Sequence, residues 1–146
     1  MRTISDFLGY DHRRLDEILP DVERSIDRGA FDHACERFAE LSCGLNRHID
    51  AEERILFPTF EQVTGMTGGP TVVMRAEHVE IRRWMALVTA SLDAQDAPGA
   101  KNAIGQLKET LAAHNRKEEQ ILYPMTDRAI GSPSERDDLV RRMQTL

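Results

Sequence analysis

Long apolar stretches and clusters of basic residues are both missing from this sequence of 146 residues. No apolar run approaches the roughly 20 residues that a membrane-spanning helix needs, so we expect no membrane segment. Residues 1–6 lack the apolar core of a signal peptide, and we therefore expect a cytoplasmic protein. The formal net charge is −6. Because nucleic-acid binding depends on a basic surface, we expect no nucleic-acid partner.

Aromatic residues and cysteines are also scarce. Aromatic residues make up 5% of the chain and apolar residues 40%, a composition that favours packed helices over a β-sandwich. The two cysteines, Cys35 and Cys43, are separated on one helix by about 12 Å of rise, which is too far for a disulfide. We expect both to be buried or partly buried thiols. The length of the chain fits a single domain that covers residues 1–146.

The chain contains two copies of one pattern, H-x-x-x-E-E-x-I-L-[F/Y]-P. The copies cover residues 48–58 and 114–124, so they are 66 residues apart. His12 and His78 have the same separation, whereas His33 stands outside the repeat and is expected at the surface. Apolar pairs keep this register: Leu15 with Ile81, Ile18 with Trp84, Leu19 with Met85, Val22 with Val88, Leu41 with Leu107, and Leu45 with Leu111. The sequence therefore predicts two copies of one helical hairpin.

Apolar residues recur at helical spacing through most of the chain, and turn residues separate the periodic stretches. We expect a bend or break near Pro58, since proline cannot continue the helical hydrogen bonds. Ser132, Pro133 and Glu135 form a capping signature at the start of a short last helix. The predicted helices cover residues 4–27, 31–62, 70–94, 98–128 and 133–145. The predicted fold is all-α: an antiparallel up-down-up-down four-helix bundle of two duplicated hairpins, plus the short C-terminal helix.

The four repeat-related histidines are predicted to face the core of this bundle. His12 and His78 lie in apolar stripes, while His48 and His114 each share a helix face with a glutamate four residues later. A single histidine on an apolar face is usually a hydrogen-bonded core residue. Two buried carboxylates are costly without partners, however, and metal ions would supply positive charge and accept the imidazole nitrogens. The predicted ligands of two ions, bridged by the glutamates, are His12, His48, Glu52, His78, His114 and Glu118.

In their order and flanking residues, these segments resemble the hemerythrin family and its HHE cation-binding domain. The pattern H…HxxxE…H…HxxxE spans most of the chain, and each paired motif is followed by the Phe/Tyr-Pro of the repeat. The resemblance implies two iron ions joined by Glu52, Glu118 and an oxo or hydroxo bridge, and zinc or manganese could take the place of iron. It assigns one iron to His12 and His48, and the other to His78 and His114.

One position departs from the oxygen-carrying hemerythrins, which have a fifth histidine one helical turn after the third. Here that position is Arg82, and its repeat mate is Asp16; the two either pair across the bundle or are exposed. The remaining set is similar to the metal domain of the bacterial repair-of-iron-centres proteins, which act in recovery from nitric oxide and oxidative damage. Two imidazoles, two glutamate oxygens and a bridge give each iron five ligands and an accessible position. A ferritin-like site needs Glu-x-x-His, and no glutamate stands three residues before a histidine here.

Several residues beside these ligands have roles that the sequence leaves open. Asp11 and Glu77 each precede a predicted ligand and can orient a neighbouring imidazole. The second glutamate of each pattern copy is expected beside the ligands or at the surface. Tyr10 and Tyr123 could donate hydrogen bonds or redox equivalents at the site, but core packing is favoured for both. Residues that could instead supply a further ligand are Asp16, Glu53, Glu77, Glu119 and Tyr123.

Three kinds of function fit this predicted site. The first is a binding or sensing protein for O2, NO or peroxide in oxidative or nitrosative stress or in iron handling. The second is a di-iron enzyme that turns over NO or peroxide or assists iron–sulfur repair. The third is a structural or storage bundle that holds zinc. The sequence indicates neither turnover nor an oligomeric state.

Overall fold

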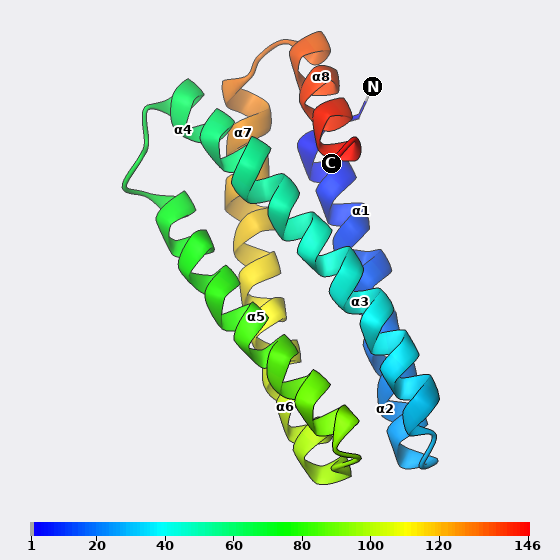
Figure 1. Cartoon of the computed structure of the whole chain (residues 1–146). Coiled ribbons are helices and arrows are strands. Elements are labelled where there is room, and N and C mark those ends of the chain that lie inside the picture. Colours follow the sequence, from blue (N-terminus) through cyan, green and yellow to red (C-terminus); the bar gives the residue numbers. More distant parts are fainter. Residues whose placement is uncertain (1) are drawn as a thin grey trace.

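The computed structural model describes residues 2–146, and every regular element within them is helical. Figure 1 shows long helical runs that lie side by side, with the chain turning back between one run and the next. The predicted all-helical bundle is therefore confirmed. The elements are α1 (Ile4–Asp16), α2 (Ile18–Asp27), α3 (Phe31–Ala51), the π-helical turn η1 (Glu52–Leu56), α4 (Phe57–Thr64), α5 (Pro70–Asp93), α6 (Ala97–Lys117), the π-helical turn η2 (Glu118–Leu122), α7 (Tyr123–Ala129) and α8 (Pro133–Gln144).

The helix predicted over 4–27 is interrupted at Glu17, which separates α1 from α2. Pro20 has no N–H group to donate to the carbonyl of Asp16, so the regular hydrogen-bond ladder cannot pass this point. The continuous helix predicted over 4–27 is therefore wrong at this point, and Pro20 was the residue that could have indicated the break.

π-helical turns interrupt the second and fourth long helices. In η1 the N–H of Phe57 donates to the carbonyl of Glu52, and in η2 the N–H of Tyr123 donates to the carbonyl of Glu118. The proline of each pattern copy follows one residue later, so the wider turn absorbs its missing donor. The disturbance expected near Pro58 is thus present as a π-helical turn, and each such turn begins at a glutamate of the repeated pattern.

The apolar core is divided into two clusters. The larger one, the α2-end cluster, includes Leu15, Leu45 and Ile81, and the smaller one, the α8-end cluster, includes Leu8 and Met74. In α1 the boundary between the clusters falls at His12, which lies between Leu8 and Leu15 in the sequence. A buried polar layer therefore separates two apolar regions of the bundle.

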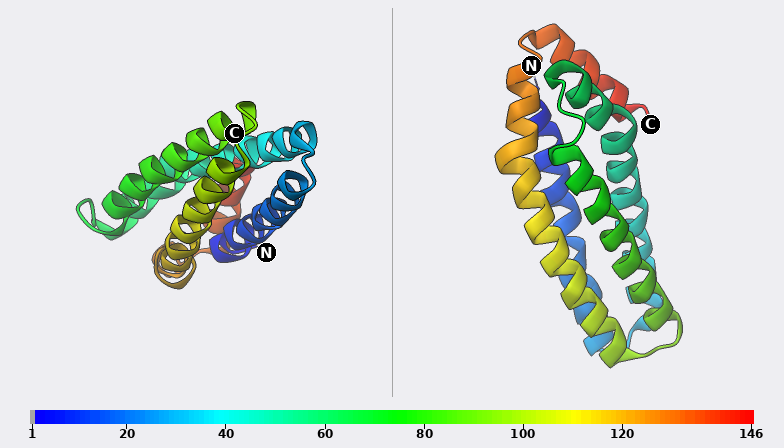
Figure 2. Two further views of the ribbon diagram at one scale, coloured as in Figure 1. Left: turned by 90° about the horizontal axis from the view of Figure 1, so that it is seen from below. Right: turned by 90° about the vertical axis from the view of Figure 1, so that its left-hand side faces the viewer.

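Helix α8 covers the end of the bundle near both termini (Figures 1 and 2). Ser132 caps it by accepting a hydrogen bond from the N–H of Glu135 at 3.5 Å, as the capping signature predicts. Its buried residues Leu139, Val140 and Met143 belong to the α8-end cluster, and the helix contacts α1 and η1. The last helix therefore packs against α1 and η1 through these apolar residues.

Features away from the metal centre confirm some of the predictions and correct others. Over residues 2–146, no helix has the length and apolar character needed to cross a membrane. Cys35 is partly buried, but Cys43 is exposed, which corrects the expectation for that thiol. Tyr10 is 62% exposed rather than packed in the core. His33 lies at the surface as predicted and contacts Asp21.

Candidate metal centre

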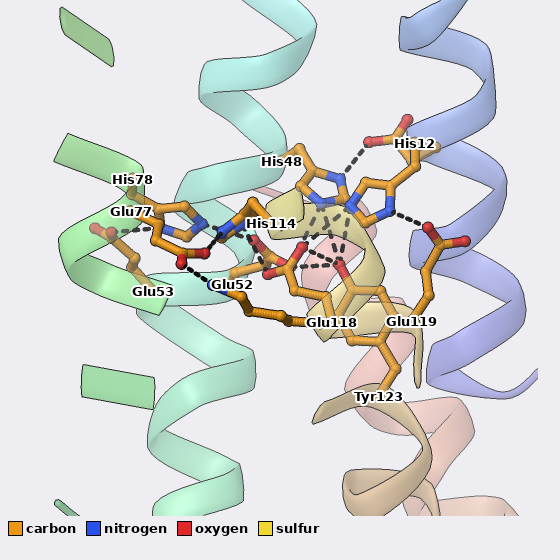
Figure 3. Close-up of polar contacts among 12 residues, drawn as sticks. His12, His48, Glu52, Glu53, Glu77, His78, His114, Glu118, Glu119 and Tyr123 are labelled. Carbon is orange, nitrogen blue, oxygen red and sulfur yellow. Dashed lines mark hydrogen bonds and ion pairs between the residues drawn. The ribbon is translucent and has the colours of Figure 1, made fainter. Parts of the chain in front are cut away.

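The six predicted ligands lie together in the polar layer between the two core clusters (Figure 3). Each is at most 4% exposed. They come from six elements: His12 from α1, His48 from α3, Glu52 from η1, His78 from α5, His114 from α6 and Glu118 from η2. The predicted convergence of these side chains is observed, and their role as metal ligands stays a prediction.

Each buried glutamate lies between a histidine of its own helical run and a histidine from the other hairpin. Glu52 Oε2 is 3.4 Å from Nε2 of His48, and Glu52 Oε1 is 3.1 Å from Nε2 of His78. Glu118 repeats this arrangement, with Oε2 3.3 Å from Nε2 of His114 and Oε1 3.2 Å from Nε2 of His12. The contacts are related by the 66-residue repeat, so the layer has approximate two-fold symmetry.

Two groups of ligand atoms result, and both include Glu52 and Glu118. The first adds His12 and His48, the second adds His78 and His114, and the ligand atoms within each group lie within 4.8 Å of one another. We call these groups the His12/His48 half and the His78/His114 half. Two ions that share both carboxylates fit this arrangement.

The outer nitrogen of every imidazole in the layer contacts a second carboxylate. The contacts are His48 Nδ1 to Asp11 at 2.8 Å, His114 Nδ1 to Glu77 at 2.8 Å, His78 Nδ1 to Glu53 at 2.7 Å and His12 Nδ1 to Glu119 at 3.3 Å. An Nδ1–H that donates to such a carboxylate leaves the Nε2 lone pair facing the centre of the layer. The orienting role expected for Asp11 and Glu77 is confirmed, and Glu53 and Glu119 do the same for the other two rings.

One buried atom in the layer lacks a hydrogen bond. Glu118 Oε2 accepts none from residues 2–146, although His114 Nε2 is 3.3 Å away. A buried carboxylate oxygen without a donor is costly, and a cation would satisfy it. Together with four centre-facing imidazole nitrogens, this donor set of nitrogen and oxygen suits iron, zinc or manganese.

A family comparison agrees with this geometry. A family model, described as the hemerythrin HHE cation binding domain, matches residues 3–126. The chain belongs to the hemerythrin HHE family. A curated relative named DNA nickase, from Nostoc sp. (strain PCC 7120), is 27% identical over 120 residues; the match covers 82% of this chain and 32% of that protein. The chain thus spans about a third of the relative's length. No solved structure matches the chain.

Tyr123 joins this polar layer as a hydrogen-bonding group, a role that the sequence allowed beside the favoured core packing. Its hydroxyl is fully buried, 2.5 Å from Glu52 Oε2 and 2.9 Å from Glu118 Oε1, and it is placed to donate its hydrogen to either carboxylate. It also lies 3.2 Å from Nε2 of His12 and 3.4 Å from Nε2 of His48. Core packing alone is therefore the wrong description of Tyr123. Its hydroxyl belongs to the His12/His48 half.

The repeat mate of Tyr123 is Phe57, which has no hydroxyl. Its ring stacks on His78 with centroids 5.5 Å apart and planes 14° apart, and the guanidinium of Arg75 lies 5.4 Å from its centroid. A buried apolar ring therefore borders the His78/His114 half. The two copies of the pattern differ at this position, Phe57 in the first and Tyr123 in the second, and this difference in the sequence could have indicated the missing hydroxyl.

Arg82, at the position of the missing fifth histidine of the hemerythrins, contacts the edge of the layer through Nη1, 3.9 Å from Oε1 of Glu53. Its guanidinium donates to Asn46 Oδ1 at 3.1 Å and to Asp50 Oδ1 at 3.2 Å on α3. Asp16 is exposed at the end of α1, so the two do not pair across the bundle. Neither residue belongs to the two groups of gathered ligand atoms.

In the metal-free chain, three side chains of this polar layer have shifted pKa values. Burial lowers the pKa of His48, but the carboxylates of Glu52 and Asp11 outweigh this effect and raise it to about 10. Burial and the nearby Glu52 raise the pKa of Glu118 to about 8. Burial and the neighbouring His48 lower the pKa of His12 to about 4. Metal binding would displace the protons on His48 and Glu118, because both must be deprotonated to act as ligands.

Proposed function

We propose that this chain is a non-haem di-iron protein that binds or senses O2, NO or peroxide during oxidative or nitrosative stress or in iron handling. The observation that carries the proposal is the pair of ligand groups that share two buried carboxylates. His12 and His48 would hold one ion, His78 and His114 the other, and Glu52 and Glu118 both. The oxo or hydroxo bridge that the family resemblance implies would complete the pair.

The four outer carboxylates support a metal role over a purely structural one. Each imidazole in the layer has its Nδ1 engaged, and ordinary core packing gives no reason for four such carboxylate–imidazole pairs to orient Nε2 toward one centre. Bound iron would supply open coordination positions and redox capacity. The chain itself would hold the imidazoles in one orientation and keep the layer dry.

The scaffold that we propose is an antiparallel up-down-up-down four-helix bundle of two duplicated hairpins. We propose one domain over residues 1–146, since α8 packs against α1 and η1 beyond the matched residues 3–126. A cytoplasmic location fits the two free thiols of Cys35 and Cys43, because a reducing compartment keeps thiols unpaired. The net charge of −6 supports a partner other than nucleic acid.

The phenol of Tyr123 favours a second candidate, a di-iron enzyme that turns over NO or peroxide. Its hydroxyl lies beside two predicted ligands and both shared carboxylates, where it can hold a proton at Oη next to a bound small molecule. Burial raises the pKa of Tyr123 well above its ordinary value, so the phenol keeps that proton in the metal-free chain. Turnover of NO or peroxide by the iron-loaded chain, lost in Tyr123→Phe, would distinguish this candidate from simple binding.

Metal content tests the main proposal most directly. Protein produced in iron-replete cells is expected to carry two irons per chain by elemental analysis, with absorption that changes when NO or O2 is added. The matched control is the same protein after chelation, which should lose both the metal and the response. Two zinc ions per chain would favour the structural role, and a metal-free chain would overturn the proposal.

A further inference from the structure

A cavity of about 320 Å³ lies immediately outside the His12/His48 half, between α1, α3 and α8. Its lining includes His48 and Asp11, which are joined by the 2.8 Å contact described above. Helix α8 contributes Met143 and Gln144. The cavity is therefore adjacent to a predicted ligand and yet separate from the buried layer.

The repeat accounts for the position of this cavity but not for its arginines. A cavity of about 180 Å³ at the equivalent place is lined by Val73, Met74 and Lys117, the repeat mates of Phe7, Leu8 and Ala51. Helix α8 has no counterpart in the repeat, so it closes only this side of the bundle. The two arginines of the lining, Arg14 and Arg47, have Glu80 and Ala113 as their repeat mates. The matching surface beside His114 thus lacks both arginines, and its cation, Lys117, pairs with Glu77.

Charge in the cavity is arranged to favour an anion. Both carboxylate oxygens of Asp11 are engaged: Oδ1 accepts from Arg14 at 2.7 Å, and Oδ2 contacts His48 Nδ1. Arg47 is exposed, and no carboxylate in residues 2–146 forms an ion pair with it. One guanidinium is therefore free, and a second is shared with a carboxylate that already has another partner.

Apart from Gln144, the remainder of the lining is apolar. Phe7 and Leu8 of α1, Ala51 of α3 and Met143 of α8 provide it. The volume is at the lower end of the ~300–1,000 Å³ range typical of small-molecule sites. An occupant needs one negative group for the arginines and a short apolar body for this wall.

We propose that the α1–α3–α8 cavity binds a small amphipathic carboxylate. Its carboxylate lies between the guanidinium groups of Arg14 and Arg47, which suit planar oxyanions. Its aliphatic or aromatic body packs against Phe7, Leu8 and Met143. No group assigned to the metal layer is needed for this binding.

Occupancy of the cavity is coupled to the metal layer through three residues, and this part rests on the proposed function. A bound carboxylate competes with Asp11 for Arg14. Asp11 then directs more of its charge to the Nδ1–H of His48, which makes that imidazole a stronger electron donor to metal. The ligand acts as an effector of the His12/His48 half.

The binding step is tested on the full-length, metal-free chain with octanoate as the probe, by isothermal titration calorimetry. We expect sub-millimolar affinity for octanoate and at least tenfold weaker binding to Arg47→Ala and to Arg14→Ala. The control Arg83→Ala, which removes an exposed arginine from α5, should bind octanoate like the parent chain. Octanol supplies the body without the charge and inorganic phosphate the charge without the body, and both should bind at least tenfold more weakly. No octanoate binding, or equal binding by Arg47→Ala or of octanol, would overturn the site.

The coupling step is tested on the iron-loaded chain, after elemental analysis has established its metal content. Octanoate should shift the visible absorption of the parent chain, and Arg14→Ala should show no shift at saturating octanoate. Saturation without a shift would overturn the coupling while the site stands. A chain that binds octanoate but no iron would contradict the proposed function and the coupling, and the calorimetry on metal-free protein would still decide the site.

Discussion

The two halves of the metal layer are built from the same duplicated pattern, yet they have different surroundings. In the His12/His48 half, a phenol hydroxyl lies 3.2 and 3.4 Å from the two Nε2 atoms. In the His78/His114 half, the repeat-related residue is Phe57, whose ring stacks on His78 instead. The cavity beside α8 adjoins only the first half. Duplication has supplied the donor atoms twice, whereas within residues 2–146 the phenol hydroxyl and the arginine-lined cavity are found beside one half alone.

This difference indicates a division of roles within one centre. The half with the phenol has a hydrogen-bond donor beside its donor atoms, and the half with the phenylalanine has an apolar wall. Donors and apolar walls stabilise different small ligands, because a polar ligand gains from a hydrogen bond that an apolar wall cannot offer. Substitutions in what the halves share should therefore have larger effects than substitutions in what separates them.

The largest effect is expected from removing what both halves share. Glu52→Ala combined with Glu118→Ala deletes the carboxylates common to both groups, so both ions should be lost while the chain stays helical. Elemental analysis and circular dichroism measure the two outcomes. Glu40→Ala with Glu80→Ala, which removes two exposed acids, is the matched control. Retention of two ions per chain by the site variant would refute the bridging assignment.

Loss of one ion instead of two is expected when the two histidines of a single half are substituted. His12→Ala with His48→Ala should leave one ion in the other half, and His78→Ala with His114→Ala should do the converse. Metal stoichiometry by elemental analysis distinguishes one remaining ion from none. If either pair of substitutions releases both ions, the halves do not bind independently and the comparison above fails at the level of the metals.

The next largest effect is expected from substituting the carboxylates that orient the imidazoles. Glu53→Gln should weaken metal binding in the His78/His114 half by about 10–100-fold, as removal of such outer partners commonly does. Glu119→Gln should have less effect, because its contact to His12 is longer, 3.3 Å against 2.7 Å, and Glu119 is 40% exposed against 29% for Glu53. Competition with a chelator measures both affinities. An equal or larger effect of Glu119→Gln would contradict this order.

The smallest effect concerns the hydroxyl that separates the halves. Tyr123→Phe makes them alike and removes a buried donor from two carboxylates, which should lower the free energy of unfolding of the metal-free chain by about 1–3 kcal/mol. Urea denaturation measures the change. Tyr10→Phe removes a hydroxyl from an exposed tyrosine and serves as the control. Unchanged stability in Tyr123→Phe would show that its hydroxyl contributes nothing to the layer.

The convergence of the donor residues could be predicted because two independent periodicities encode it. The helical spacing of Leu8, His12 and Leu15 places the histidine on the core face, and the 66-residue repeat duplicates the hairpin. These signals are local or internal to the sequence. The outer contacts of Asp11 and Glu77 followed from their positions beside predicted ligands.

Other features depend on where separate helices meet, and the sequence does not carry that information in a local form. Tyr123 and Phe57 occupy equivalent positions in the pattern, and the sequence favoured core packing for Tyr123. The direction of the Tyr123 hydroxyl depends on the π-helical turn before it and on the packing of η1 opposite it. The same holds for the cavity, one wall of which forms where α8 folds back onto α1.

The polar layer that divides the apolar core has a consequence for how this bundle opens. Two apolar regions without a continuous apolar connection form natural units of local unfolding, and cooperativity between them depends on what joins them. In the metal-free chain that junction is a set of hydrogen bonds among ionisable side chains. In the loaded chain it would be a pair of ions coordinated from all four helical runs. Amide hydrogens at the two ends should therefore exchange independently in the first state and together in the second, so that iron supply would set the size of the cooperative unit.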